Sequence, residues 1–178
     1  MQGSDIKVYN QRSVIDNDFD SNDYYISRDK FAELNEFEIF RDDILLTTRG
    51  TIGRCAIFPA NKYKGILHPC LIRIQLNQEI ISNVFARFYI QDAQSFFESV
   101  KYNSNATTID VIYGETLRDV VFVVPARNEQ DQIVEFLDQE TAKINTQVYG
   151  EQKSIELLKK YRSALISEVV TGKIDVRG

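Results

Sequence analysis

The sequence predicts an α+β fold in which a sheet-rich globular domain is followed by one long C-terminal helix. Short segments of strand length fill residues 1–127, without the regular strand–helix alternation of a parallel α/β protein. Residues 128–170 instead repeat apolar side chains at helical spacing. The sequence therefore divides into a globular domain, residues 1–127, and a helix with a short tail, residues 128–178.

The first half of the predicted domain consists of strands joined by polar loops. Residues 5–9 and 70–76 alternate apolar and polar side chains, as half-buried strands do. Ser27 begins a capping pattern that predicts a short helix. Gly50 and Gly53 enclose a tight turn between two apolar runs, which predicts a hairpin. The further predictions are a strand over 24–26, the helix over 29–34, hairpin strands over 44–47 and 54–58, and loops over 10–23 and 59–64.

The second half of the domain contains the longer of its two predicted helices. Residues 82–101 place their apolar side chains on one side of a helix, which predicts an amphipathic helix. A polar loop over residues 102–108 follows it. Residues 109–112 and 120–124 are predicted strands because both are rich in β-branched side chains. Residues 114–117 between them predict a short turn of helix.

The C-terminal helix has a predicted start and a predicted stop. Asn128 is a suitable N-cap, and Gly172 follows the last apolar residue of the repeat. A continuous helix over residues 128–170 would extend roughly 65 Å at about 1.5 Å per residue. Gly150 lies in the middle of this helix and costs about 1 kcal/mol relative to alanine. Two helices broken at Tyr149–Gly150, or a helix buried in a core, are therefore the alternatives.

The helix also carries an apolar seam that predicts pairing with a second helix. Thr141, Glu151 and Arg162 interrupt the seam, but its other positions keep the spacing of a two-position repeat. Residues 129–140 contain acids and no bases, whereas residues 159–162 contain bases and no acids. An antiparallel second copy would place these opposite charges side by side, so the sequence predicts an antiparallel homodimer. The seam residues are Leu137, Ile144, Val148, Ile155, Leu158 and Leu165.

The charge of the chain is unevenly distributed. The net charge of −5 argues against unselective binding of nucleic acid. Residues 44–127, however, carry nine bases against six acids, while the segments on either side have an excess of acids. A surface that faces phosphate is therefore expected in the middle third of the chain.

The composition predicts a cytoplasmic protein without a catalytic centre. Cys55 and Cys70 form no disulfide framework, and no apolar run has the length of a membrane span. His68 is the only histidine, so neither a catalytic triad nor a zinc site with the two cysteines is expected. Asp42 and Asp43 are more simply explained as a solvated turn before a strand than as a metal pair. We therefore expect no metal and no cofactor.

Binding remains as the expected function, and the middle third supplies candidate residues for DNA. Lysine and arginine suit phosphate, whereas asparagine suits the paired hydrogen bonds of adenine in the major groove. The polar loop that begins at Lys101 combines both types, although asparagine and serine also populate turns for local reasons. The predicted DNA contacts are Arg49, Arg54, Lys62, Lys64, Lys101, Tyr102, Asn103, Asn105 and Thr107.

Three segments of the chain resemble the specificity subunits of type I restriction-modification systems. Residues 158–166, Leu-Lys-Lys-Tyr-Arg-Ser-Ala-Leu-Ile, and residues 171–176, Thr-Gly-Lys-Ile-Asp-Val, are similar to the end of the spacer helix of that family. Residues 43–53, Asp-Ile-Leu-Leu-Thr-Thr-Arg-Gly-Thr-Ile-Gly, are similar to a strand–turn signature within its target-recognition domain. The resemblance covers most of the chain from about residue 40 onward.

The resemblance implies a function for each part of the chain. The globular domain would recognise half of a split target in double-stranded DNA. The helix would act as a spacer and as the docking surface for the adenine methyltransferase subunits, to which S-adenosylmethionine would belong. The chain would select where these subunits and a restriction subunit act, and would itself neither methylate nor cleave. The usual family member has two recognition domains and two spacer helices, and an aromatic-rich segment before its first strand. This chain has one recognition domain and one spacer helix, and it lacks the aromatic-rich segment before Asp5. It is therefore expected to be either a half-subunit that pairs with itself or a fragment.

Two functions of other classes remain as alternatives. The acidic composition is also compatible with a helix-mediated interaction module that binds protein and no DNA. An enzyme that acts through Asp42, Asp43 or His68 is the second alternative, and alanine replacement of these residues would test it.

Overall fold

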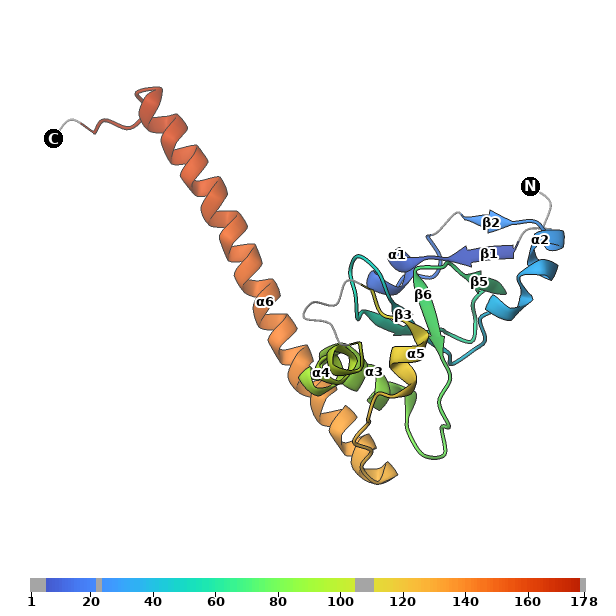
Figure 1. Ribbon diagram of the computed structural model, residues 1–178. Coiled ribbons are helices and arrows are strands. Elements are labelled where there is room, and N and C mark those ends of the chain that lie inside the picture. Colours follow the sequence, from blue (N-terminus) through green and yellow to red (C-terminus); the bar gives the residue numbers. More distant parts are fainter. Residues whose placement is uncertain (1–5, 22–23, 105–110, 177–178) are drawn as a thin grey trace. The chain divides into compact units, whose positions relative to one another are not determined.

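The computed structural model describes residues 6–21, 24–104 and 111–176 (Figure 1). It contains two compact units, Met1–Val134 and Glu135–Gly178. The first unit holds two three-stranded sheets and the shorter helices, and the second holds most of one long helix and the tail that follows it. This arrangement confirms the predicted α+β class with a long C-terminal helix. The domain boundary between residues 127 and 128 stays a prediction.

The first sheet has the strand order β2-β1-β5. Strand β1 (Ile6–Tyr9) pairs antiparallel with β2 (Tyr25–Ile26) and parallel with β5 (Gly65–Leu67), so that Val8 lies opposite Ile66. Strands β1 and β2 agree with the predicted strands. Strand β5 was not predicted, because it is only three residues long and pairs with a strand that is distant in sequence.

Two short helices lie between the strands of the first sheet in sequence. Helix α1 (Gln11–Ile15) is capped by Asn10, whose side chain accepts hydrogen bonds from the first backbone N–H groups. The loop predicted over 10–23 is therefore wrong in this part, since a single helical turn is too short to show a period. Helix α2 (Arg28–Glu33) is capped by Ser27, as predicted, and the 3-10 helix η1 (Asn35–Phe37) follows it.

The second sheet has the order β4-β3-β6 and separates two apolar cores. Strand β3 (Ile44–Thr47) pairs antiparallel with β4 (Cys55–Ile57) and with β6 (Leu71–Ile74), which confirms the predicted hairpin and the strand after it. All four residues of β3 are buried. Because successive side chains of a strand point to opposite faces, Leu45 enters one core while Leu46 enters the other.

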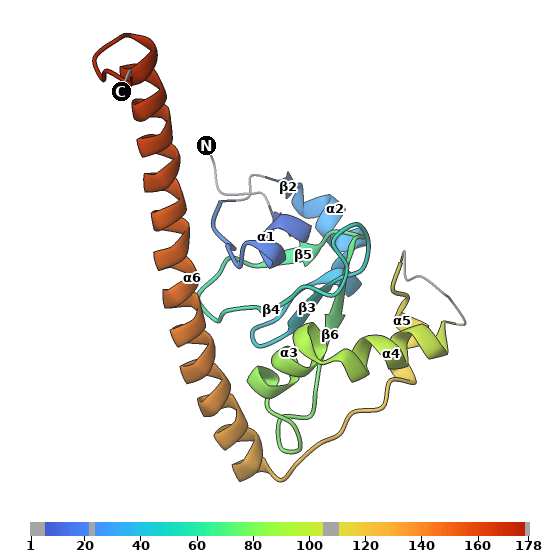
Figure 2. The ribbon, with the colours of Figure 1, turned by 90° about the vertical axis from the view of Figure 1, so that its left-hand side faces the viewer.

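The core on the Leu46 side is closed by two helices, α3 (Asn83–Asp92) and α4 (Gln94–Asn103). They are seen nearly end-on in Figure 1 and from the side in Figure 2. The single helix predicted over 82–101 is wrong, since Ala93 adopts an extended conformation with ψ of 122°. The break redirects the chain, so that Phe96 and Val100 of α4 are buried in the same core as residues of α3.

The core on the Leu45 side is built around three aromatic rings. Tyr9, Phe19 and Phe58 pack edge to face, with ring centroids between 4.9 and 5.9 Å apart. All three side chains are buried. This core therefore joins β1 to the segment that follows α1 and to the residue that follows β4.

The segment after the second core helix differs from the prediction. Helix α5 (Gly114–Arg118) agrees with the predicted turn of helix. Of the strand predicted over 109–112, residues 109 and 110 lie outside the described residues, and Val111 forms an isolated bridge with Arg49. The strand predicted over 120–124 is wrong: alternate side chains of this extended segment pack on the core, but it pairs with no described strand. Alternating burial of side chains thus shows that one face of the segment packs on the core, but it does not require hydrogen bonds to a neighbouring strand.

Helix α6 (Arg127–Val170) begins one residue before the predicted N-cap Asn128, which lies inside the helix. Gln130 is completely buried in the first turns of this helix. Its Oε1 accepts a hydrogen bond from the backbone of Ser82 (2.8 Å), and its Nε2 donates to the carbonyl oxygens of Ile80 and Pro125 (2.9 Å each). Gln130 therefore fastens the start of α6 to the N-terminus of α3 within the first unit.

Replacing Gln130 with alanine is expected to lower the free energy of unfolding by about 1–3 kcal/mol, because it leaves buried backbone groups without partners. Urea unfolding followed by circular dichroism measures this loss. Gln132 is exposed on the same helix, and its replacement with alanine is the control, with an expected change within about 0.5 kcal/mol. Equal stability of the two variants would contradict the fastening role.

Helix α6 continues without a break to Val170, so the alternative of two helices separated at Gly150 is wrong. Gly172 ends it with a φ of +74°. The backbone N–H of Gly172 donates to Val169 O (3.1 Å) and that of Lys173 to Glu168 O (2.8 Å), which is the Schellman arrangement and confirms the predicted stop. Within the described part of the chain, no helix combines the length and the apolar character needed to cross a bilayer.

Candidate nucleic-acid interface

The turn between β3 and β4 carries two of the predicted DNA contacts. Gly50 and Gly53 adopt positive φ angles of 67° and 80°, which glycine tolerates without strain. The Thr47 hydroxyl donates to the carbonyl oxygen of Thr51 (2.5 Å) and accepts a hydrogen bond from the backbone N–H of Arg54 (3.0 Å). These bonds close the turn, which makes it a defined support for the side chains around it.

Gln11 on helix α1 holds the same turn from outside. Its Nε2 donates to the carbonyl oxygens of Arg49 (2.7 Å) and Thr51 (3.2 Å). Arg49 and Arg54 are both exposed at this turn. Sequence reasoning missed Gln11, because it lies in a segment predicted as a loop and its partners are distant in sequence.

An open, polar depression of about 420 Å³ lies beside Arg54, and Arg87 of helix α3 also lines it. Burial is the main cause that raises the pKa of the neighbouring Cys55 thiol to about 12. The charge of Arg87 lowers this pKa, that of Asp92 raises it, and that of Arg54 lowers it. Both guanidinium groups thus act on the same buried thiol. In the sequence Arg87 is one of several bases in the middle third, and no signal there links it to Arg54.

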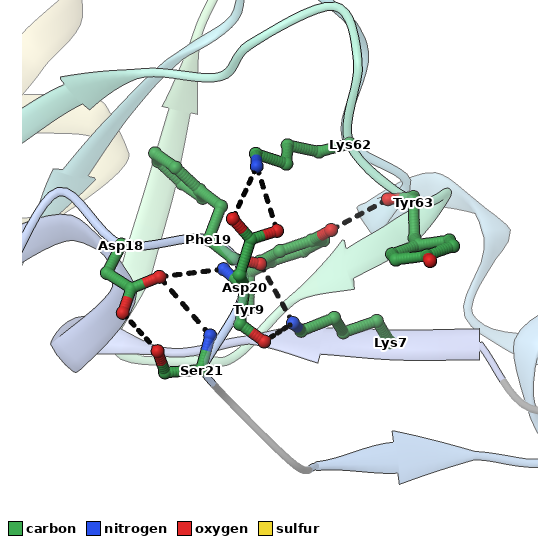
Figure 3. A network of polar contacts seen from close by, with 8 residues as sticks. All are labelled: Lys7, Tyr9, Asp18, Phe19, Asp20, Ser21, Lys62 and Tyr63. Carbon is green, nitrogen blue, oxygen red and sulfur yellow. Dashed lines mark hydrogen bonds and ion pairs between the residues drawn. The ribbon is translucent and has the colours of Figure 1, made fainter.

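Lys62 and Lys64 are each engaged by a carboxylate. Lys62 Nζ contacts both carboxylate oxygens of Asp20 (2.8 and 2.6 Å), as Figure 3 shows, and its side chain is 19% exposed. Lys64 Nζ lies 2.8 Å from Glu38 Oε1 and 4.7 Å from the centre of the Phe31 ring. Their contact with phosphate stays a prediction, and it would have to replace an existing ion pair in each case.

The Lys62 ion pair belongs to a wider polar network (Figure 3). The buried Lys7 donates from Nζ to the carbonyl oxygens of Phe19 and Asp20 (2.8 Å each). The Tyr9 hydroxyl donates to Tyr63 O (2.8 Å), and burial followed by the charge of Asp20 raises the pKa of Tyr9 to about 12. The network thus fixes the segment after α1 against β1 and against the loop that contains Lys62.

The predicted recognition loop after Lys101 is partly helical. Lys101, Tyr102 and Asn103 form the last turn of α4, so the loop predicted to begin at residue 102 starts later. Tyr102 is 82% exposed, whereas the Nδ2 atom of Asn103 is buried without a hydrogen-bond partner among the described residues. Asn105 and Thr107 lie outside the described residues.

The residues considered for catalysis have structural surroundings. Asp43 is buried and accepts hydrogen bonds from Phe40 N (2.7 Å) and Gln75 Nε2 (2.8 Å), while Asp42 pairs with Arg41 at the surface. His68 Nδ1 lies 2.9 Å from Cys70 Sγ at the edge of an open depression of about 880 Å³. No group of three or more potential metal ligands occurs among the residues that the structure describes.

The second unit presents the predicted seam to solvent. Ile144, Val148, Ile155 and Leu158 are 47–66% exposed, Leu165 is 39% exposed and Leu137 is half-buried. Exposed apolar side chains in a continuous series on one helix indicate a surface for a partner.

Comparison with known proteins assigns the family. Residues 2–157 match the sequence model of the type I restriction modification DNA specificity domain. The chain belongs to this family. The match confirms the resemblance to this family and includes the strand–turn signature at residues 43–53, whereas residues 158–166 and 171–176 of the spacer helix lie after its last residue. The match supports a DNA target-recognition role for this specificity domain.

Two curated proteins and one solved structure are similar to this specificity domain. A putative type I restriction enzyme specificity subunit of Haemophilus influenzae is 28% identical over 153 residues, which cover 82% of this chain and 37% of that protein. The specificity subunit of the Escherichia coli type I restriction enzyme EcoBI is 25% identical over 88 residues, which cover 49% of this chain and 19% of that protein. The specificity domain therefore spans little more than a third of the first relative.

The solved structure supports the fold. It is one chain of a structure titled "Structural basis underlying complex assembly and conformational transition of the type I R-M system". Its TM-score is 0.66 at 15% identity, and the match covers 94% of this specificity domain and 38% of that chain. The small sheets and the long C-terminal helix thus recur in a protein of distant sequence.

Proposed function

We propose that this chain is the DNA-recognition component of a type I restriction-modification system, acts in the cytoplasm and catalyses no reaction itself. The family match, which extends through the globular unit and into helix α6, is the observation that carries the proposal. Partner methyltransferase subunits would bind S-adenosylmethionine and modify adenine, and a restriction subunit would cleave. The chain would determine where both act on double-stranded DNA.

The proposed DNA contacts are cations and polar residues of the first unit. Arg49 and Arg54 are presented by a turn that is closed by its own hydrogen bonds, and Tyr102 is exposed beside Lys101. Cations fix the position of a protein on the phosphate backbone, whereas amide groups distinguish base edges. Lys62, Lys64, Asn103, Asn105 and Thr107 complete the proposed set.

Helix α6 is proposed to pair antiparallel with a second helix, supplied by another copy of the chain. If Ile144 of one helix lies opposite Ile155 of the other, the acid-rich residues 129–140 face residues 159–170, where the bases Lys159, Lys160 and Arg162 lie. A parallel pair would instead place like charges together. The paired helices would then form the surface on which the methyltransferase subunits dock.

Selection from a random library of duplexes tests the recognition proposal. The chain and a type I methyltransferase subunit are incubated with the library, and the bound duplexes are recovered and sequenced. A short motif that contains adenine is expected to be enriched only when the chain is present, with the methyltransferase subunit alone as the control. A bound pool identical to the input would reject recognition, and a dimer that binds no duplex would support the alternative of a protein-interaction module.

A further inference from the structure

Some lysine and arginine side chains of the first unit form an ion pair with a carboxylate, and others do not. Lys62 and Lys64 are held by Asp20 and Glu38, and Arg73 lies 3.8 Å from the buried Asp43. Arg54 and Arg87 form no ion pair with any residue that the structure describes. An anion can therefore approach these two guanidinium groups without displacing a carboxylate.

Arg54 and Arg87 come from different elements and line the same depression of about 420 Å³. Arg54 immediately precedes β4, and Arg87 lies in the middle of α3. Asn17 and Gln91 also line the depression, so two amide side chains accompany the two guanidinium groups. No acidic side chain is among the described residues that line it, although Asp92 lies close enough to act on Cys55.

The backbone around the depression is fixed by hydrogen bonds between β4 and α3. The Cys55 N–H donates to Gln91 Oε1 (3.3 Å), and the Cys55 thiol donates to Arg87 O (3.5 Å). The Arg87 guanidinium lies 4.4 Å from the centre of the Phe88 ring, which restricts its position. The backbone segments that carry the two arginines are therefore joined before any ligand arrives.

We propose that Arg54 and Arg87 form a binding site for a phosphate group of the DNA backbone. Guanidinium groups bind phosphate oxygens through two parallel N–H donors, and two such groups around one open polar depression suit a doubly contacted phosphodiester. Asn17 and Gln91 supply further neutral donors. The site carries no base information, so it acts equally on all sequences and sets the position of the neighbouring β3–β4 turn on the duplex. This assignment rests on the proposed DNA recognition.

Arginine footprinting tests the site directly. The full chain with its methyltransferase partner is treated with phenylglyoxal, with and without a duplex, and modified arginines are quantified by mass spectrometry. A target duplex and a scrambled duplex are each expected to slow modification of Arg54 and Arg87 by about fivefold or more at low salt. Arg12 and Arg41, whose side chains are 88% and 72% exposed, are the internal controls and should react unchanged.

Salt dependence provides a second measurement with matched variants. The double change Arg54→Gln and Arg87→Gln should weaken binding to both duplexes by the same factor and reduce the slope of log K against log salt by about 0.9 for each phosphate that is no longer bound. The double change Arg12→Gln and Arg41→Gln also removes two charges, but it should leave the slope unchanged, because these arginines pair with Asp16 and Asp42 and are not among the proposed DNA contacts.

The outcomes distinguish failure of the phosphate site from failure of the proposed DNA recognition. Preference for the target duplex without protection of Arg54 and Arg87 would overturn the site and leave recognition standing. Protection of both arginines by all duplexes, in a complex without preference, would support the site and reject recognition. Absence of binding to any duplex would overturn both. An unchanged salt slope in the arginine variant would also overturn the site.

Discussion

Replacing Leu158 and Leu165 together with lysine is expected to raise the dissociation constant of the proposed α6 dimer by about a hundredfold or more. The two side chains are 66% and 39% exposed in the single chain, and the proposed seam would bury them. Each buried leucine contributes roughly 1.5–3 kcal/mol, and 1.4 kcal/mol corresponds to a factor of ten. The parent is therefore expected to be a dimer at micromolar concentration and the variant a monomer, as measured by light scattering and analytical ultracentrifugation.

The control for this change uses apolar residues of the same helix outside the seam. Tyr149 and Leu157 are 70% and 58% exposed, and their replacement with lysine should leave the dimer intact. Circular dichroism should show that the first unit remains folded in both variants. A parent chain that is monomeric at micromolar concentration, or a control that dissociates as strongly as the seam variant, would contradict the proposed pairing.

Replacing Gly65 with alanine is expected to lower the free energy of unfolding of the globular unit by about 3 kcal/mol or more. A β-carbon at residue 65 would collide with the carbonyl oxygen of Lys7 and with the Tyr9 ring. The carbonyl belongs to the adjacent strand β1, and the ring is buried between Phe19 and Phe58, so neither can move without loss of packing. Urea unfolding followed by tyrosine fluorescence and circular dichroism measures the effect.

Gly114 provides the matched control, because it begins helix α5 and a β-carbon there would meet no atom within 4 Å. Its change to alanine should keep or slightly raise stability, since alanine favours a helix over glycine. If the Gly65 variant unfolds at the same urea concentration as the Gly114 variant, the close approach of β5 to β1 is not required for the fold.

Several features of this protein follow from the sequence because they depend on neighbouring residues alone. The spacing of apolar side chains after residue 128 determines that helix α6 forms, and Gly172 ends it through its own positive φ. The same spacing defines the residues of the proposed seam. Gly50 and Gly53 likewise determine the turn of the β3–β4 hairpin. The family was recognisable for the same reason, since its signatures are short continuous segments.

Other features were decided by the tertiary structure, because they depend on which distant segments meet. The apolar run at residues 120–124 has the composition of a strand but pairs with no described strand, and the three residues of β5 form one because β1 lies beside them. The partners of charged side chains likewise depend on which distant segments meet. The sequence counts Lys62 and Arg54 equally as cations, whereas folding brings Asp20 to Lys62 and Arg87 to the depression beside Arg54. Electrostatic energy falls with the distance through space, and that distance is set by packing and not by separation along the chain.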